Sequence, residues 1–116
     1  MTFHLAACAE MLYLELPFVE RVKLIHEMGF QVEIWDWTSK DLVELESTGA
    51  VFSSMTGYVS GDLLTGKGIA ALLESAASSI KVAKKLGCAR LNLHGTGLGA
   101  NGTALIQRTE VTPGEW

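Results

Sequence analysis

Hydrophobic and polar positions follow two different periods along this chain. Residues 3–9, 31–35, 51–55 and 89–94 have the short, apolar or alternating character of strands. Between the first two of these segments, Phe18, Val22 and Ile25 recur at helical spacing, after Pro17 and before Gly29. Proline suits the start of a helix and glycine its end, so a helix is predicted between these two residues.

Two further helices are predicted between the later strands. Thr38 or Ser39 is expected to cap a short helix with Asp41 in its first turn, and Gly49 is expected to end it. The clearest helix covers residues 67–86 and ends at Gly87. Its apolar positions predict one buried stripe, made of Ile69, Leu72, Leu73, Ala76, Ile80 and Ala83.

The strand and helix segments alternate in the order βαβαβαβ, which predicts a parallel sheet with right-handed crossovers. Two architectures fit this order, a doubly wound open sheet and the beginning of a (β/α)8 barrel, and periodicity does not separate them. A closed barrel needs about 250 residues, so 116 residues would supply its first half. Thr112, Pro113 and Glu115 resemble the start of a fourth helix, and we therefore expect an interrupted barrel.

Composition and charge limit the classes of partner. With 48% apolar residues and two prolines, the chain is expected to form one compact domain. A net charge of -4, from 13 acidic and 9 basic residues, predicts neither a nucleic-acid partner nor an anionic lipid surface. No apolar run reaches membrane-spanning length, and the N-terminus lacks the basic segment of a signal peptide.

Two cysteines bear on the redox compartment of the protein. Cys8 and Cys88 lie on or beside predicted strands, without C-x-x-C spacing. Buried free thiols are therefore favoured over a disulfide or a metal site. Free thiols suit a reducing compartment, so we expect a cytoplasmic protein.

A glycine-rich stretch follows the last predicted strand. Gly97, Gly99 and Gly102 match the G-x-G-x-x-G pattern of dinucleotide-binding loops. That motif needs a helix at its last glycine and an acidic residue about 20 residues later. Poor helix formers follow Gly102, and the chain ends at Trp116 before such an acid. We expect a loop near the substrate that binds no dinucleotide, and a nucleotide-binding open sheet is the weaker alternative.

The segment YLELPFVERVKLIHEMGFQVEIW, residues 13–35, resembles the first helix and second strand of the hydroxypyruvate isomerase family of xylose-isomerase-like barrels. The motif E-x-P-F-x-E-R, from Glu15 to Arg21, is its most specific part. The similarity extends over nearly the whole chain through Gly29, Phe30, Val32, Glu33, Gly61 and Asp62. The chain is one residue shorter between Phe30 and Glu33, and Cys8 replaces the usual asparagine, so the substrate stays open.

The resemblance implies a (β/α)8 TIM barrel of the xylose-isomerase-like type. Residues 1–116 would be its N-terminal half, with the first four strands and three helices, truncated at the start of the fourth helix. It implies an aldose-ketose type isomerase that converts hydroxypyruvate to tartronate semialdehyde through an enediol, with two carboxylates and, where used, Mg²⁺ or Mn²⁺. Those carboxylates and metal ligands come from the second half, so no catalytic or metal-binding residue is expected here and the chain alone should be inactive.

The substrate-binding residues are expected at the carboxyl ends of the strands, where barrels carry their active sites. If Val32 and Ile34 face the helices, Glu33 and Trp35 point inward. The same alternation in residues 89–94 points His94 inward. The residues expected to bind a small hydroxy acid, keto acid or sugar are Glu33, Trp35, His94 and Tyr13, with Thr56 and Asn92 as neighbours.

Other interpretations stay open at this point. Glu33 could form an ion pair within the barrel, His94 could be a core histidine, and Trp37 is expected to pack within its loop. A different class of function is a non-catalytic half-barrel that binds a second copy of itself. Exposed edge strands would require such a partner, which makes a homo-oligomer an expected state.

Overall fold

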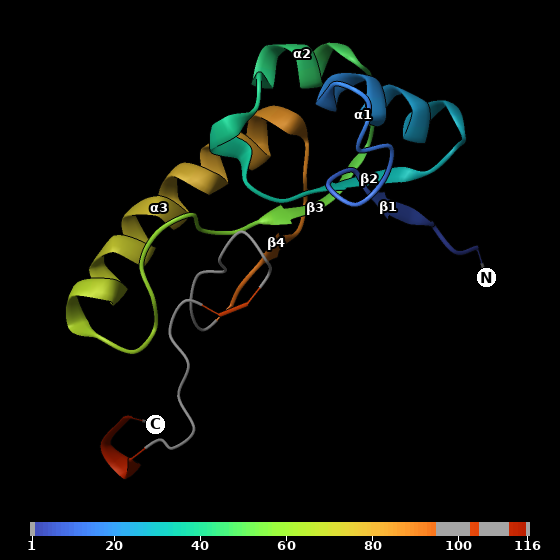
Figure 1. The fold of residues 1–116 in the computed structure, drawn as a ribbon. Coiled ribbons are helices and arrows are strands. Elements are labelled where there is room, and N and C mark those ends of the chain that lie inside the picture. Colours follow the sequence, from blue (N-terminus) through green and yellow to red (C-terminus); the bar gives the residue numbers. More distant parts are fainter. Residues whose placement is uncertain (1, 95–102, 105–111, 116) are drawn as a thin grey trace.

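The computed structural model describes residues 2–94, 103–104 and 112–115, and it has four strands joined by helices in the predicted order (Figure 1). The first half of the chain forms β1 (Ala6–Cys8), α1 (Phe18–Glu27), β2 (Gln31–Ile34), the short 3-10 helix η1 (Trp37–Ser39) and α2 (Leu42–Ser47). The second half forms β3 (Phe52–Thr56), α3 (Gly66–Leu86), β4 (Leu91–Asn92) and the 3-10 helix η2 (Pro113–Glu115).

The four strands form one parallel sheet in the order β1-β2-β3-β4. A register shift interrupts the β2–β3 pairing, because Val32 pairs with Phe52 while Glu33 pairs with Ser54. Ser53 lies between these pairs, and its hydroxyl donates a hydrogen bond to the carbonyl oxygen of Val32 at 3.3 Å. Such irregularities change the direction in which the following side chains point. The shift brings Ser54 beside Glu33, on the face of the sheet that carries no helix.

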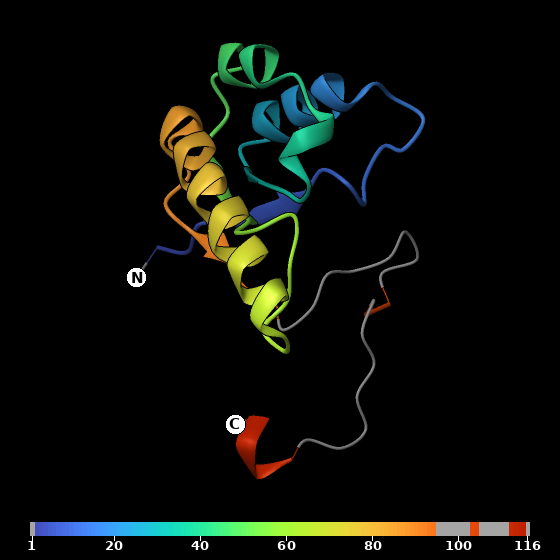
Figure 2. The ribbon, with the colours of Figure 1, turned by 90° about the vertical axis from the view of Figure 1, so that its left-hand side faces the viewer.

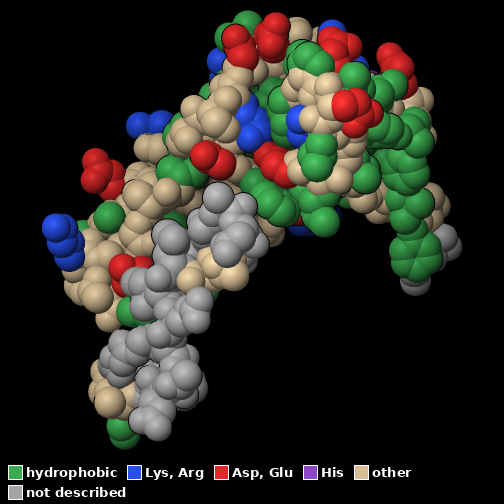
Figure 3. Space-filling model, viewed as in Figure 1, with side chains coloured by type: hydrophobic (Ala, Val, Ile, Leu, Met, Phe, Trp, Pro, Cys, Tyr) green, Lys and Arg blue, Asp and Glu red, His purple; other side chains and the backbone are tan. Residues whose placement is uncertain are grey.

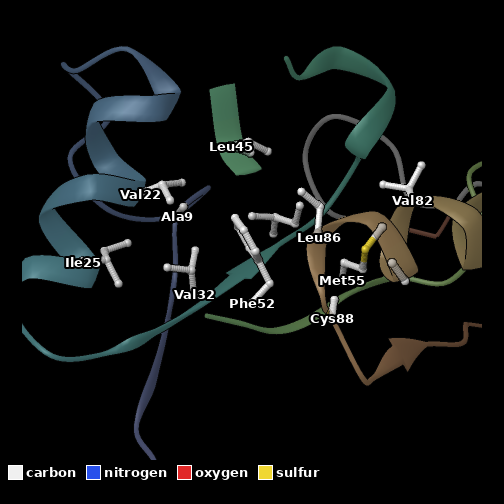
Figure 4. Packing of buried hydrophobic residues seen from close by; sticks show 12 residues of the cluster. Ala9, Val22, Ile25, Val32, Leu45, Phe52, Met55, Val82, Leu86 and Cys88 are labelled. Atoms are coloured by element: carbon white, nitrogen blue, oxygen red, sulfur yellow. The ribbon is translucent and has the colours of Figure 1, made fainter. Parts of the chain in front are cut away.

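All three α-helices pack on the same face of the sheet, as both ribbon views show (Figures 1 and 2). One hydrophobic cluster joins β2 and β3 to side chains from each helix (Figure 4). Its fully buried valine, isoleucine, leucine and methionine side chains each stabilise the fold by about 1.5–3 kcal/mol. The cluster consists of Ala9, Val22, Ile25, Val32, Ile34, Leu45, Phe52, Met55, Val82, Ala83, Leu86 and Cys88. The other face of the sheet carries none of the described helices and is left for polar side chains.

Helix α1 has the predicted ends. It begins at Phe18, directly after Pro17, and its last residue is Glu27. Gly29 follows with φ of +85°, a conformation that favours glycine, and its N–H donates to the carbonyl oxygen of His26 at 2.9 Å. Local sequence signals therefore define this helix.

The predicted cap of the short second helix is wrong. Asp41 caps α2, because its carboxylate accepts hydrogen bonds from the backbone N–H groups of Val43 and Glu44, both at 3.0 Å. Thr38 and Ser39 belong instead to the 3-10 helix η1. A carboxylate that reaches two orphan N–H groups satisfies more of a helix start than one hydroxyl does, so α2 begins after Asp41.

The predicted buried stripe of α3 is partly wrong. Ile69, Leu73 and Ile80 are 41%, 62% and 46% exposed, although Leu72 and Ala83 are buried as expected. The buried face carries serines in place of the missing apolar residues, at positions 75 and 79. Both serine hydroxyls form hydrogen bonds with segments that precede the helix. The buried face of α3 therefore combines apolar and hydrogen-bonded serine side chains, and it differs from the face that hydrophobicity alone predicts.

Candidate functional site

The helix-free face of the sheet carries polar side chains near the carboxyl ends of its strands. Cys8 of β1 pairs with Glu33 of β2, and Glu33 pairs with Ser54 of β3, so the three form a row across the sheet. All three are half-buried. Trp35 follows β2 and contacts Glu33. We call Cys8, Glu33, Trp35 and Ser54 the Glu33 cluster.

Two neutral donors hold the carboxylate of Glu33. The indole Nε1 of Trp35 donates to Oε1 at 3.2 Å, and the hydroxyl of Ser54 donates to Oε2 at 3.2 Å. Within the described part of the chain, no basic side chain forms an ion pair with Glu33. The structure therefore does not support the alternative of an ion pair inside the barrel. Each carboxylate oxygen keeps a free lone pair, because it accepts one of two possible bonds. Glu33 can therefore accept a hydrogen bond from a ligand hydroxyl.

The thiol of Cys8 lies in a negative environment. Burial raises its pKa above the ordinary value, and the charges of Glu10 and Glu33 raise it further. Cys8 is therefore a neutral thiol near pH 7 and a weak hydrogen-bond donor, not a nucleophile. Cys88 is buried, and both cysteines are free thiols, as predicted.

The two tryptophans after β2 have different environments. Trp35 is 43% exposed beside Glu33. Trp37 packs against the core, and its indole Nε1 donates to the hydroxyl of Ser79 on α3 at 2.9 Å. Trp37 therefore packs against the core and α3, not within its loop as predicted, and Trp35 is left available to a ligand.

His94 lies beyond the end of β4, where its side chain is exposed. Its backbone carbonyl accepts a hydrogen bond from the hydroxyl of Tyr58 at 2.6 Å, and the two rings lie 6.5 Å apart. Burial, with a smaller contribution from Asp62, raises the pKa of Tyr58 and so preserves its donor proton. His94 is therefore not a core histidine, and Tyr58, which the sequence did not single out, fixes the backbone at its position.

Tyr13 is not brought together with Glu33. Its hydroxyl donates to the sulfur of Met28 at 3.4 Å, and Met28 lies between α1 and the start of β2. Tyr13 therefore extends toward the amino edge of the sheet, away from the Glu33 cluster. The same edge has an open hollow of about 290 Å³, lined by Phe3, His4, Leu5, Met28, Gly29, Phe30 and Gln31.

Thr56 and Asn92 continue the polar row toward the other edge of the sheet. They pair with each other across β3 and β4, and both are half-buried. The remaining sequence candidates, Gly97, Gly99 and Gly102, lie outside the described residues. The structure therefore brings Glu33 and Trp35 together, and has Thr56 on the adjacent strand β3 and Asn92 one strand further, on β4.

Sequence reasoning missed an ion pair that lies beside this cluster. Glu10 follows β1 and Lys40 follows η1, and their charged atoms lie 2.7 Å apart. Only 16% of the Glu10 side chain and 8% of the Lys40 side chain are exposed. The residues lie far apart in the sequence and neither belongs to a local motif, so no signal in the chain predicts their contact.

No family model, curated protein or solved structure matches the chain. The described residues contain no group of three or more His, Cys, Asp or Glu side chains that could hold a metal ion. Among the same residues, no helix has the length and apolar character needed to cross a membrane.

Proposed function

We propose that this chain is the first half of a (β/α)8 barrel of the hydroxypyruvate isomerase type, and that the carboxyl edge of its strands binds a small hydroxy acid, keto acid or sugar. One observation carries the proposal. The carboxylate of Glu33 lies on the helix-free face near the strand ends, held by Trp35 and Ser54 through neutral hydrogen bonds. A ligand hydroxyl could bind there without displacing a cation.

The arrangement of the strands supports the barrel over a doubly wound sheet. In a barrel each strand pairs with its neighbours in the sequence and the helices form an outer layer. The described strands have this sequential order, and α1, α2 and α3 share one face (Figure 2). A doubly wound sheet has helices on both faces and a point where the strand order reverses.

The residues of the Glu33 cluster suit ligand binding more than catalysis. The carboxylate of Glu33 would accept a hydrogen bond from a hydroxyl next to the reacting carbonyl, and the exposed ring of Trp35 would cover the ligand. The described residues do not provide a set of ligands for the divalent metal that the resemblance implies, so we assign none of them to it. The proton transfer itself is left to carboxylates outside this chain.

Titration with hydroxypyruvate and with tartronate tests the proposal. We expect saturable shifts of the Trp35 indole signal in ¹H–¹⁵N spectra, and Glu33→Gln should weaken binding about 10-fold or more, as loss of a charged hydrogen-bond acceptor does. Glu44→Gln is the matched control, because Glu44 is exposed on α2. No Trp35 shift at millimolar ligand, or equal weakening by both variants, would contradict the proposal.

Activity assays test whether the catalytic residues lie outside this half of the proposed barrel. The 116-residue chain should not isomerise hydroxypyruvate with or without Mg²⁺ or Mn²⁺. Turnover well above background would mean that the catalytic carboxylates lie in this chain after all.

A second candidate, a non-catalytic half-barrel that pairs with a copy of itself, is favoured by the sheet edges. Among the described residues, β1 and β4 each pair on one side only. Large exposed hydrophobic side chains precede and follow β1, and Figure 3 shows hydrophobic side chains over the N-terminal end of the molecule. They are Phe3, Leu5, Met11, Leu12 and Leu14. Sedimentation equilibrium tests this candidate, since a monomer at 100 µM would exclude a stable pair.

A further inference from the structure

We propose that Lys40 is a positioning residue that orients Trp35, and through it Glu33, for ligand binding; the ligand part of this inference rests on the function proposed above. Lys40 touches neither residue of that pair. It acts on the backbone segment that follows Trp35 and leads to α2.

The ammonium group of Lys40 joins three segments at the carboxyl edge of the sheet. Its Nζ lies 2.7 Å from Oε1 of Glu10, in the loop after β1, and 4.4 Å from the ring centre of Phe18, at the start of α1. It donates hydrogen bonds to the carbonyl oxygen of Asp36 at 2.7 Å and to the hydroxyl of Ser39 at 3.4 Å, both in the loop after β2. The group therefore links the first two strand-to-helix loops.

The contact with Asp36 is the one that reaches the site. Asp36 follows Trp35 directly, and Lys40 fixes its carbonyl, while its carboxylate accepts from the backbone N–H of Thr38 at 2.8 Å. On the far side, Trp37 is anchored to α3 by its hydrogen bond to Ser79. Since the backbone is fixed immediately after Trp35, the indole keeps the direction in which it donates to Glu33.

Burial makes the ammonium group difficult to replace. The Lys40 side chain is 8% exposed, and a buried cation without its partners is strongly unfavourable. Within the described residues, neither carboxylate oxygen of Glu10 accepts a hydrogen bond of good geometry, so the short contact with Lys40 is an ion pair held by charge. Charge holds Lys40 against Glu10, and the hydrogen bond from Lys40 to the carbonyl oxygen of Asp36 orients the backbone after Trp35.

Four variants separate positioning from plain stabilisation. Lys40→Met removes the cation, and Glu10→Gln combined with Lys40→Met removes both charges and leaves no unpaired buried ion. Lys23→Met is the matched control, because Lys23 forms an ion pair of similar length with Glu20, at 2.8 Å, on an exposed helix face. Trp35→Phe identifies the Trp35 indole signal in ¹H–¹⁵N spectra.

In the ligand-free protein, both Lys40 variants should move the Trp35 indole signal toward its position in free tryptophan. The double variant should recover most of the stability lost in Lys40→Met, while the indole signal stays displaced. The dissociation constant for hydroxypyruvate should rise about 10-fold in both, which corresponds to about 1.4 kcal/mol of binding free energy. Lys23→Met should leave signal and affinity unchanged.

Two results would overturn the inference. One is an unchanged Trp35 indole signal in the Lys40 variants, and the other is full return of the signal in the double variant, which would make Lys40 a purely stabilising residue. If Lys40→Met does not fold, the double variant decides the question. Absence of ligand binding in the unaltered protein would refute the proposed function alone, because the indole signal is measured without ligand.

Discussion

Substitution of Gly61 offers a sharp test of how α3 is attached to the sheet. Gly61 has φ of +90°, and a Cβ atom there would overlap the backbone nitrogen of Leu72 and the carbonyl oxygen of Gly68, and would lie 2.8 Å from the Cα of Leu72. All three atoms belong to the backbone of a helix, which cannot move aside as a flexible side chain can. Gly61→Ala should therefore force the first turns of α3 away from the segment before it.

The size of the effect follows from two contributions. A left-handed backbone conformation costs an L-residue about 1–2 kcal/mol, and overpacking against a rigid neighbour adds about 1–3 kcal/mol. Gly29 has nearly the same φ, +85°, but no atom lies within 4 Å of the position that a Cβ would occupy there. Gly29→Ala therefore carries the first contribution alone, about 1–2 kcal/mol, and Gly61→Ala should lose about 2–5 kcal/mol.

Urea unfolding followed by circular dichroism at 222 nm measures both variants. With equal m values, the difference between their midpoints reports the packing contribution. In thermal melts each kcal/mol should lower the Tm by about 4 °C for a domain of this size. Equal losses in Gly29→Ala and Gly61→Ala would refute the reasoning, because the overlap with α3 would then have no energetic weight.

Three further predictions concern single contacts. Asp41→Ala should lower the unfolding free energy by about 0.5–2 kcal/mol in urea melts, and no loss would contradict its capping role. Ser79→Ala should cost about 1–3 kcal/mol and much less in a Trp37→Phe background, whereas additive losses would contradict their hydrogen bond. Glu33→Gln should lower the pKa of Cys8, which that charge raises, and accelerate its alkylation by iodoacetamide at pH 8, followed by mass spectrometry; an unchanged rate would contradict the contact.

Local chemistry made much of this fold predictable. Pro17 and Gly29 define α1, and Gly87, with φ of +68°, ends α3. Alternation in β2 correctly separates the buried Val32 from Glu33 on the opposite face. Each of these features is decided within a few neighbouring residues, which is the range over which sequence patterns are informative.

Other features depend on segments that meet only in the folded protein. The buried face of α3 carries Ser79, which accepts a hydrogen bond from Trp37, whereas hydrophobicity alone favours burial of the exposed Leu73. No pattern in the sequence predicts the contact between Glu10 and Lys40 either. β1 is shorter than the predicted residues 3–9, because only Ala6–Cys8 find pairing partners on β2. Tertiary contacts therefore override local preference at the points that build the site.

The sequential strand order also bears on how the chain acquires its structure during synthesis. Each strand pairs with the one made just before it, so β2 can add to β1, and β3 to β2, without waiting for a distant part of the chain. Because the pairing partners are consecutive strands, the chain between them is shorter than it would be for distant partners, which limits the entropy lost before a contact forms. The ribosome releases the strands in the same order, and every newly added strand becomes the edge to which the next one attaches. An arrangement of this kind can lengthen by one strand and one helix at a time without changing the pairs already made.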